Sequence, residues 1–225
     1  FFGNKLKLIS FSIWGNNPKY TIGALKNADL ASEIYPDWLC RFYVSFDVPR
    51  GIIYELEEKE NVEVVEVNKL GDWTFSFNRF LPISEDNIDA VISRDADSRL
   101  NLREKLAVDE WLESDKGFHI MKDHPWHHSY PILAGMFGCK SKVIANISDK
   151  INSFSKSDWY HTDQEFLKTI IYPEIKNNVF VHDEFSGANP FPIERKGLEF
   201  VGKVYDENDV TVEEHLPPLA NWIQR

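Results

Sequence analysis

The 225-residue chain is poor in cysteine, has no excess of positive charge and contains no long hydrophobic run. Its two cysteines, Cys40 and Cys139, lie in apolar segments, so we expect buried free thiols in a reducing compartment; a single disulfide is the alternative. The net charge of −11 argues against a nucleic-acid binder that neutralises phosphates. No hydrophobic stretch approaches about 18 residues, so we expect no membrane span and a cytoplasmic protein.

What is present is an ordinary globular composition with many aromatic side chains. Apolar residues make up 43 % of the chain and charged residues 27 %, and the length allows one domain with a full core over residues 1–225. The seven Trp and sixteen Phe residues can fill that core, but aromatic side chains also line clefts that bind sugars or bases.

Strand-like and helix-like segments alternate along the first hundred residues. Strands are predicted at 6–13, 38–44, 62–67 and 88–92, with helices at 18–34 and 49–60 and a short helical segment at 75–81. Further along, we expect helices at 101–114 and 163–176, strands at 118–121, 132–137 and 179–182, and a mostly irregular tail. Asn17, Asn101 and Thr162 are the expected helix caps. The alternation predicts an α/β fold with a mainly parallel sheet and helices on both faces.

Two aspartates, Asp95 and Asp97, follow the apolar strand 88–92. Side chains alternate along a strand, so the two carboxylates can point the same way. They follow the carboxyl end of the strand, which is where open α/β folds bind ligands. Hard oxygen donors suit Mg²⁺ or Mn²⁺, and such an ion suits a diphosphate. The alternatives are a polar turn, or a purely structural cluster of ion pairs with Arg94 and Arg99.

Three segments resemble the nucleotide-sugar glycosyltransferases of the GT-A fold: the polar loop after the first strand, residues 94–99 (RDADSR) and residues 134–136 (AGM). Residues 162–167 (TDQEFL) resemble the Asp-Gln-x-x-Leu segment of the retaining branch that includes glycogenin and bacterial lipooligosaccharide galactosyltransferases. The chain is also similar to compact glycosyltransferase domains of bacteria and large algal viruses. The resemblance spans about residues 6–204, although only the acidic pair and the Asp-Gln segment are distinctive.

This resemblance implies a Rossmann-like three-layer sandwich that transfers a sugar from a UDP-sugar to a glycan or other hydroxyl acceptor, with retention. It further implies that Asp95, Asp97 and His182 hold Mn²⁺ or Mg²⁺ against the donor diphosphate; the alternative for His182 is a strand-end histidine satisfied by hydrogen bonds. The family's Lys-Pro-Trp does not follow His182, so phosphate contacts are expected from Lys203, Arg195 or Arg79.

The catalytic residues implied by the resemblance are Asp163 and Gln164. Gln164 would face the reacting side of the sugar, and Asp163 would bind its hydroxyls or stabilise positive charge at the anomeric carbon. The alternative is that both merely occupy the first turn of a helix, where acids offset the helix dipole.

The donor-binding residues implied by the resemblance come from six stretches of the chain. They are Phe11, Ser12, Trp14, Tyr20, Arg79, Ser93, Arg94, Asp95, Ala96, Asp97, Asp123, His124, Gly135 and Lys203. Core packing explains Phe11 equally well, and a surface location explains Arg79. A zinc site in residues 123–128 is disfavoured, because that stretch has no cysteine and no helical histidine pair.

Two other classes of protein remain as alternatives. A sugar-nucleotide pyrophosphorylase would also bind a nucleotide and metal on such a sheet, but loop 14–18 lacks the glycine-rich, basic character usual there. A non-catalytic carbohydrate-binding or scaffolding module is the second alternative.

Overall fold

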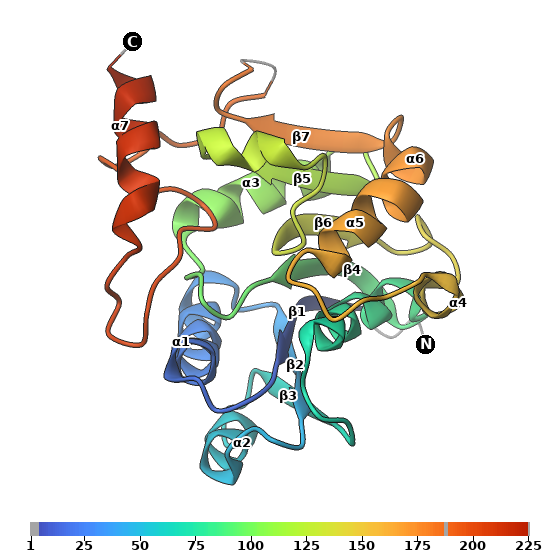
Figure 1. Cartoon of the computed structure of the whole chain (residues 1–225). Coiled ribbons are helices and arrows are strands. Elements are labelled where there is room, and N and C mark those ends of the chain that lie inside the picture. The colour runs from blue at the N-terminus through green and yellow to red at the C-terminus, as the bar shows by residue number, and fades with distance from the viewer. Residues whose placement is uncertain (1–4, 187–188, 225) are drawn as a thin grey trace.

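The computed structural model of the chain describes residues 5–186 and 189–224. The strands are β1 (Leu6–Ile13), β2 (Leu39–Ser45), β3 (Val62–Val67), β4 (Ile88–Arg94), β5 (Phe118–Lys122), β6 (Met136–Lys140) and β7 (Val179–Asp183). They form one sheet in the order β3-β2-β1-β4-β6-β5-β7 (Figure 1). Neighbouring strands are parallel except where β6 runs against β4 and β5.

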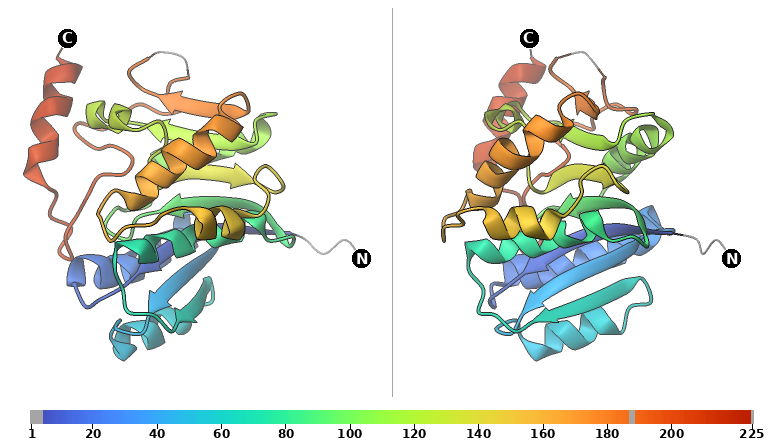
Figure 2. Two further views of the ribbon diagram at one scale, coloured as in Figure 1. Left: turned by 45° about the vertical axis from the view of Figure 1, so that its right-hand side comes forward. Right: turned by 90° about the vertical axis from the view of Figure 1, so that its right-hand side faces the viewer.

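Helices cover both faces of the sheet (Figure 2). One face packs against α1 (Pro18–Ile34), α2 (Arg50–Glu57) and α3 (Leu102–Glu113). The other packs against the 3-10 helix η1 (Trp73–Ser84), α4 (Ile147–Ser153) and a continuous helical run of α5 (Thr162–Phe166), the π-helical turn η3 (Leu167–Ile171) and α6 (Tyr172–Ile175). The short helices η2 (Pro125–Ser129), η4 (Glu213–His215) and α7 (Leu216–Ile223) complete the description. The expected three-layer α/β sandwich is confirmed.

Local sequence explains how α1 comes to lie close to the sheet. The side chain of Asn17 accepts a hydrogen bond from Lys19 N at 3.0 Å, and Pro18 occupies the first turn, as expected. Ala24, Ala28 and Ala31 are fully buried, and their small side chains let the helix pack tightly on the strands.

The other two predicted caps had different outcomes. Asn101 Oδ1 accepts from Glu104 N at 3.0 Å, which confirms the start of α3. The Thr162 cap was wrong: α5 already includes Thr162, whose hydroxyl accepts from Ser157 N at 3.3 Å instead. A hydroxyl can cap a helix or fasten a neighbouring loop, and the sequence alone does not distinguish the two uses.

Two expected segments also differ from the structure. The strand predicted at 132–137 begins only at Met136, because the buried apolar residues before it belong to a turn. The described part of the tail is mostly irregular as far as Val212, as expected, but its end is helical, because η4 and α7 lie there. Pro217 and Pro218 suggested a break, but both lie in the first turn of α7, where proline is tolerated.

The two thiols behave as expected: Cys40 and Cys139 are buried and are not joined in a disulfide. Across the two described ranges, no helix combines the length and apolar character needed to cross a bilayer.

A buried ion pair connects the end of β4 to α3. Arg94 Nε donates to Glu104 Oε1 at 3.0 Å, and both side chains are almost completely buried. Tyr35 donates its hydroxyl to the same carboxylate oxygen at 3.1 Å, and burial followed by the charge of Glu104 holds the Tyr35 pKa well above its usual value. This pair fixes the strand from which the acidic loop departs.

We therefore expect Glu104→Ala to lower the free energy of unfolding by about 3–5 kcal/mol, because it leaves the Arg94 charge buried without a partner. Asp109→Ala is the matched control on the same helix: its pair with Lys105 is partly exposed, and its loss should cost no more than about 0.5 kcal/mol. Urea denaturation measures both values. Equal losses for the two variants would contradict this assignment.

Candidate functional site

The carboxyl ends of β1 and β4 meet where the strand order reverses, which is where open α/β sheets form a ligand crevice. A first lobe of this crevice, with a volume of about 150 Å³, lies there. It is lined by residues from the ends of β1 and β4, from α1, from η1 and from α5. These are Ser12, Ile13, Trp14, Tyr20, Trp73, Ser76, Arg79, Asp95, Ala96, Asp97, Tyr160, His161, Asp163, Gln164 and Val204.

A second lobe of about 160 Å³ adjoins the first. The two lobes share Asp95, Gln164 and Val204, so these residues stand at their junction. The second lobe is otherwise lined by histidines, apolar side chains and two glycines. These are His124, Trp126, His127, Leu133, Gly135, Met136, Phe200, Gly202 and His215.

Two carboxylates dominate the electrostatics of the first lobe. Burial and then the charge of Asp95 raise the pKa of Asp97. Lys19 opposes that shift with an ammonium 2.8 Å from Asp97 Oδ2. Asp95 is partly exposed and accepts a hydrogen bond from Arg79 Nη1. The pair therefore gathers negative charge that requires cations nearby.

Arg79 connects this acidic pair to α5. Its Nη2 donates to Asp163 Oδ2 at 2.8 Å, while its main-chain N–H donates to Ser12 Oγ at 3.0 Å. Burial raises the pKa of Asp163, and the Arg79 guanidinium acts in the opposite direction. The Arg79 Nε is buried and has no partner within the described residues. One guanidinium therefore holds two carboxylates of the crevice, Asp95 and Asp163, at once.

Gln164 is oriented by its amide oxygen, which accepts from Ala134 N at 3.1 Å. The amide nitrogen makes no hydrogen bond to any residue the structure describes, so it is a donor available at the junction of the two lobes.

The acidic loop, residues 95–99, packs closely against α1 through one buried amide. Asn27 Nδ2 donates to the carbonyls of Ala96 at 3.2 Å and Ser98 at 2.8 Å, and Asn27 Oδ1 accepts from Leu100 N at 3.0 Å. A Cβ at Gly23 would stand 2.1 Å from Ala96 O, so only glycine permits this approach.

Gly135 lies where the second lobe meets the acidic pair. It does line the second lobe, but a Cβ there would stand 1.9 Å from Asp95 Oδ2. Its missing side chain therefore makes room for the Asp95 carboxylate.

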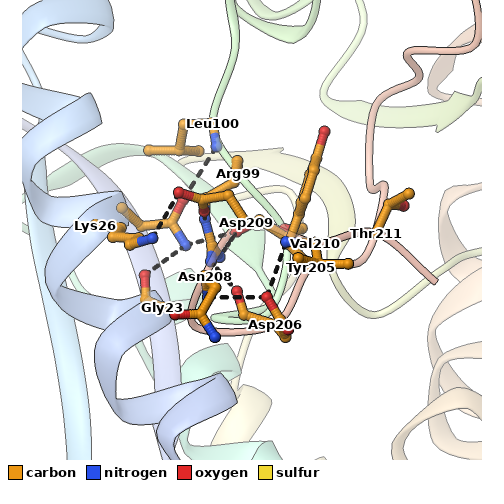
Figure 3. A network of polar contacts seen from close by, with 12 residues as sticks. Gly23, Lys26, Arg99, Leu100, Tyr205, Asp206, Asn208, Asp209, Val210 and Thr211 are labelled. Carbon is orange, nitrogen blue, oxygen red and sulfur yellow. Dashed lines mark hydrogen bonds and ion pairs between the residues drawn. The ribbon is translucent and has the colours of Figure 1, made fainter.

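The C-terminal segment is tied to the acidic loop by a polar network, shown in Figure 3. Tyr205 N donates to Asp97 O at 2.8 Å. Arg99 Nε and Lys26 Nζ both bind Asp209, at 2.9 and 2.5 Å. The chain beyond this network reaches His215, whose pKa is lowered mainly by burial and raised in part by the charge of the neighbouring Glu214. A histidine more than a hundred residues away in sequence thus lines the second lobe together with Asp95.

The structure brings most of the predicted site residues to this crevice. The first lobe contains Ser12, Trp14, Tyr20, Arg79, Asp95, Ala96, Asp97, Asp163 and Gln164, and the second adds His124 and Gly135.

Three expected donor-binding residues lie elsewhere because they complete the core. Phe11 is fully buried and stacks on Phe42 with ring centroids 4.6 Å apart. Ser93 donates its hydroxyl to Ala134 O at 2.7 Å, and Arg94 forms the buried pair described above. These residues position the strand and do not line either lobe.

Two charged residues expected at the donor are used in ion pairs. Asp123 is fully buried and is bound by Arg103 at 3.0 Å and Arg195 at 2.6 Å. Lys203 binds Glu199 at 2.6 Å. Neither Asp123 nor Lys203 lines a lobe, and the structure therefore corrects both expectations.

His182 is not brought to the aspartates. Its Nδ1 is 2.8 Å from His119 Nε2, and its Nε2 is 3.0 Å from Glu110 Oε2. In the described ranges, no group of three or more His, Cys, Asp or Glu residues is arranged to hold a metal ion. The expected set of Asp95, Asp97 and His182 is therefore not assembled; His182 corresponds to the alternative of a strand-end histidine satisfied by hydrogen bonds.

Several residues that line the crevice or pair with a residue lining it were not found from the sequence. Lys19 could have been suspected, since it follows the Asn17-Pro18 helix start directly after the first strand. Trp73, Tyr160 and His215 carried no local signal, because their place in the crevice depends on contacts between distant segments.

The chain matches no protein-family model and no curated protein. Among solved structures it is similar to a glycosyltransferase involved in the glycosylation of the major capsid of PBCV-1, with 14 % identity over 81 % of this chain and 83 % of that chain and a TM-score of 0.52. It is likewise similar to the 4-diphosphocytidyl-2C-methyl-D-erythritol synthase of Anaerococcus prevotii, with 12 % identity over 99 % and 100 % of the two chains and a TM-score of 0.53.

A third similar structure is the mannosyltransferase PcManGT of Pyrobaculum calidifontis in complex with GDP-Man and Mn²⁺. The identity is 12 %, the TM-score is 0.53, and the match covers 83 % of this chain and 59 % of that one. At such identities the likeness establishes the fold, and the chain has the GT-A, Rossmann-like fold expected from its sequence.

The close approach of Gly23 to Ala96 predicts that replacing Gly23 by alanine changes stability in the direction opposite to the usual one. Gly→Ala inside a helix normally stabilises by about 0.5–1 kcal/mol. At Gly23 the new Cβ would collide with Ala96 O, so Gly23→Ala should destabilise the protein by about 1–3 kcal/mol. Gly51→Ala in α2, where nothing lies within 4 Å, is the control and should stabilise it. Denaturant unfolding measures both, and a stabilising Gly23→Ala would refute the contact.

Proposed function

We propose that the chain is a metal-dependent glycosyltransferase that moves a sugar from a UDP-sugar to a hydroxyl of a glycan or similar acceptor, with retention of configuration. The observation that carries the proposal is the meeting of Asp95, Asp97, Asp163 and Gln164 around one two-lobed crevice. The fold supports it, because similar structures include sugar-transferring enzymes, one of them in complex with GDP-Man and Mn²⁺.

The acidic pair fits a divalent cation shared with a diphosphate. Burial and then the charge of Asp95 raise the pKa of Asp97, so the ionised pair gains from an added cation. Mg²⁺ is commonly held by one or two carboxylates together with substrate phosphates, and needs no cage made only of protein groups. Asp95 and Asp97 would hold the ion, which would stabilise the charge of the departing UDP.

The histidine that this proposal places beside the donor is His215, not His182. His215 lines the second lobe with Asp95, whereas His182 is engaged with His119 and Glu110. His215 would contact the donor phosphates from the C-terminal side.

The first lobe suits the nucleotide. Trp14, Trp73 and Tyr160 offer aromatic surface for a base, and Ser12 offers a hydroxyl. Burial and the charges of Asp97 and Asp95 raise the pKa of Tyr20 to about 12, so its hydroxyl keeps its proton at neutral pH and can donate to ribose or phosphate.

The junction of the lobes suits the reacting sugar. Breaking a glycosyl-phosphate bond places positive charge on the anomeric carbon. The Asp163 carboxylate, held by Arg79, can stabilise that charge, and the Gln164 amide nitrogen can donate to a sugar hydroxyl. With retention, the departing phosphate accepts the proton of the acceptor hydroxyl on the same face.

A nucleotidyltransferase is the second candidate, favoured by one observation: the similar synthase of Anaerococcus prevotii covers the chain from end to end. The two candidates differ in what leaves the donor. A glycosyltransferase releases a nucleoside diphosphate, whereas a nucleotidyltransferase releases pyrophosphate from a nucleoside triphosphate.

We expect release of UDP from at least one UDP-sugar in the presence of Mn²⁺, and an α-linked product from an α-linked donor by NMR. Screening nucleotide sugars for hydrolysis and for transfer to glycan acceptors measures this. Pyrophosphate release from CTP or UTP with a sugar phosphate would favour the nucleotidyltransferase, and a β-linked product would contradict retention.

We further expect Asp97→Asn to abolish the Mn²⁺-dependent part of UDP binding and to lower turnover at least a hundredfold, because one of two metal-binding carboxylates is lost. Asp115→Asn, at a largely exposed aspartate remote from the crevice, is the control and should change neither quantity. Isothermal titration with UDP, with and without Mn²⁺, measures binding. Wild-type binding that Mn²⁺ does not strengthen would favour a non-catalytic module.

A further inference from the structure

The first lobe holds more negative than positive charge. Three carboxylates line it, Asp95, Asp97 and Asp163, and they face the guanidinium of Arg79 and the ammonium of Lys19. A nucleoside diphosphate would add further negative charge. The protein therefore needs a cation that can serve the phosphates when the nucleotide is bound.

Each of the cations first expected to contact phosphate is already paired with a carboxylate. Lys203 binds Glu199, and Arg195 binds the buried Asp123. Arg79 is deeply buried and holds Asp95 and Asp163 together, so moving it would leave the buried Asp163 uncompensated.

Lys19 differs from these three in position and in freedom. It lies in the first turn of α1, where Asn17 fixes its main-chain N–H, and the next residue, Tyr20, lines the first lobe. Its side chain is 29 % exposed, and within the described residues its ammonium forms an ion pair with Asp97 alone. A lysine head on a four-carbon stem can turn to another partner without moving the helix.

We propose that Lys19 is an exchangeable counter-ion: it neutralises Asp97 in the ligand-free protein, and on binding of a divalent cation with the nucleotide its ammonium moves to the diphosphate. This inference rests on the proposed function and adds a residue and a step to it. The same lysine then serves Asp97 and the donor phosphates in turn, and the acidic pair is never left without a cation.

The proposed exchange predicts that one substitution strengthens the binding of Mn²⁺ alone and weakens the binding of UDP. Lys19→Met removes a competitor for Asp97, so the protein should bind Mn²⁺ alone more tightly. It also removes a charged phosphate contact, so UDP affinity in the presence of Mn²⁺ should fall about tenfold or more. Affinity for uridine, which has no phosphate, should not change, and Lys19→Arg should recover most of the UDP affinity.

Isothermal titration of wild type and variants with Mn²⁺, with uridine and with UDP plus Mn²⁺ measures these quantities. Lys59→Met is the matched control, because Lys59 is similarly exposed and pairs with Asp29 away from both lobes; it should leave all three affinities unchanged.

The inference is overturned if Lys19→Met leaves UDP affinity within twofold of wild type, lowers uridine affinity by the same factor, or leaves Mn²⁺ affinity unchanged. A wild-type protein that binds neither UDP nor uridine would instead overturn the proposed function, and this inference with it.

Discussion

The geometry of the crevice depends on the buried side-chain amide of Asn27. It satisfies the carbonyls of Ala96 and Ser98 and the N–H of Leu100, so the main chain of the acidic loop is fixed against α1. Buried main-chain groups must find partners, and here one side chain supplies three of them. Because the loop cannot move away from the helix, Asp97 stays within reach of Lys19, and Asp95 stays beside Arg79.

The buried charges of this protein fall into two kinds that look alike in sequence. Asp123 is surrounded by Arg103 and Arg195 and holds the C-terminal part of the chain in place. Asp163 has one arginine partner and lines the first lobe. The difference is access: a carboxylate enclosed by two guanidinium groups stabilises the fold, whereas one that borders a cavity can also meet a ligand.

The sequence predicted those features of the molecule that depend on residues close together in the chain. The Asn17 and Asn101 caps, the α/β alternation and the position of Asp95 and Asp97 after a buried strand are all properties of short segments. The structure does not place Asp123 and Lys203 in the crevice, and it does not place His182 beside the acidic pair. The surroundings of each of these residues depend on which distant segment packs beside it. His215 reaches the crevice through contacts between distant segments, such as that of His124 Nε2 with His215 O at 2.8 Å, which no periodicity or spacing indicates.

The reversed direction of β6 has a consequence for how such a protein can diversify. Its first residue, Met136, pairs with Arg94 at the end of β4, and its partner β5 ends at Lys122 on the same edge of the sheet. The connection between β5 and β6 therefore starts and finishes at the crevice, and it carries His124, Leu133 and Gly135 into the second lobe. Residues can be inserted or exchanged in this connection without shifting any strand, so new ligand preferences can evolve there while the core stays unaltered.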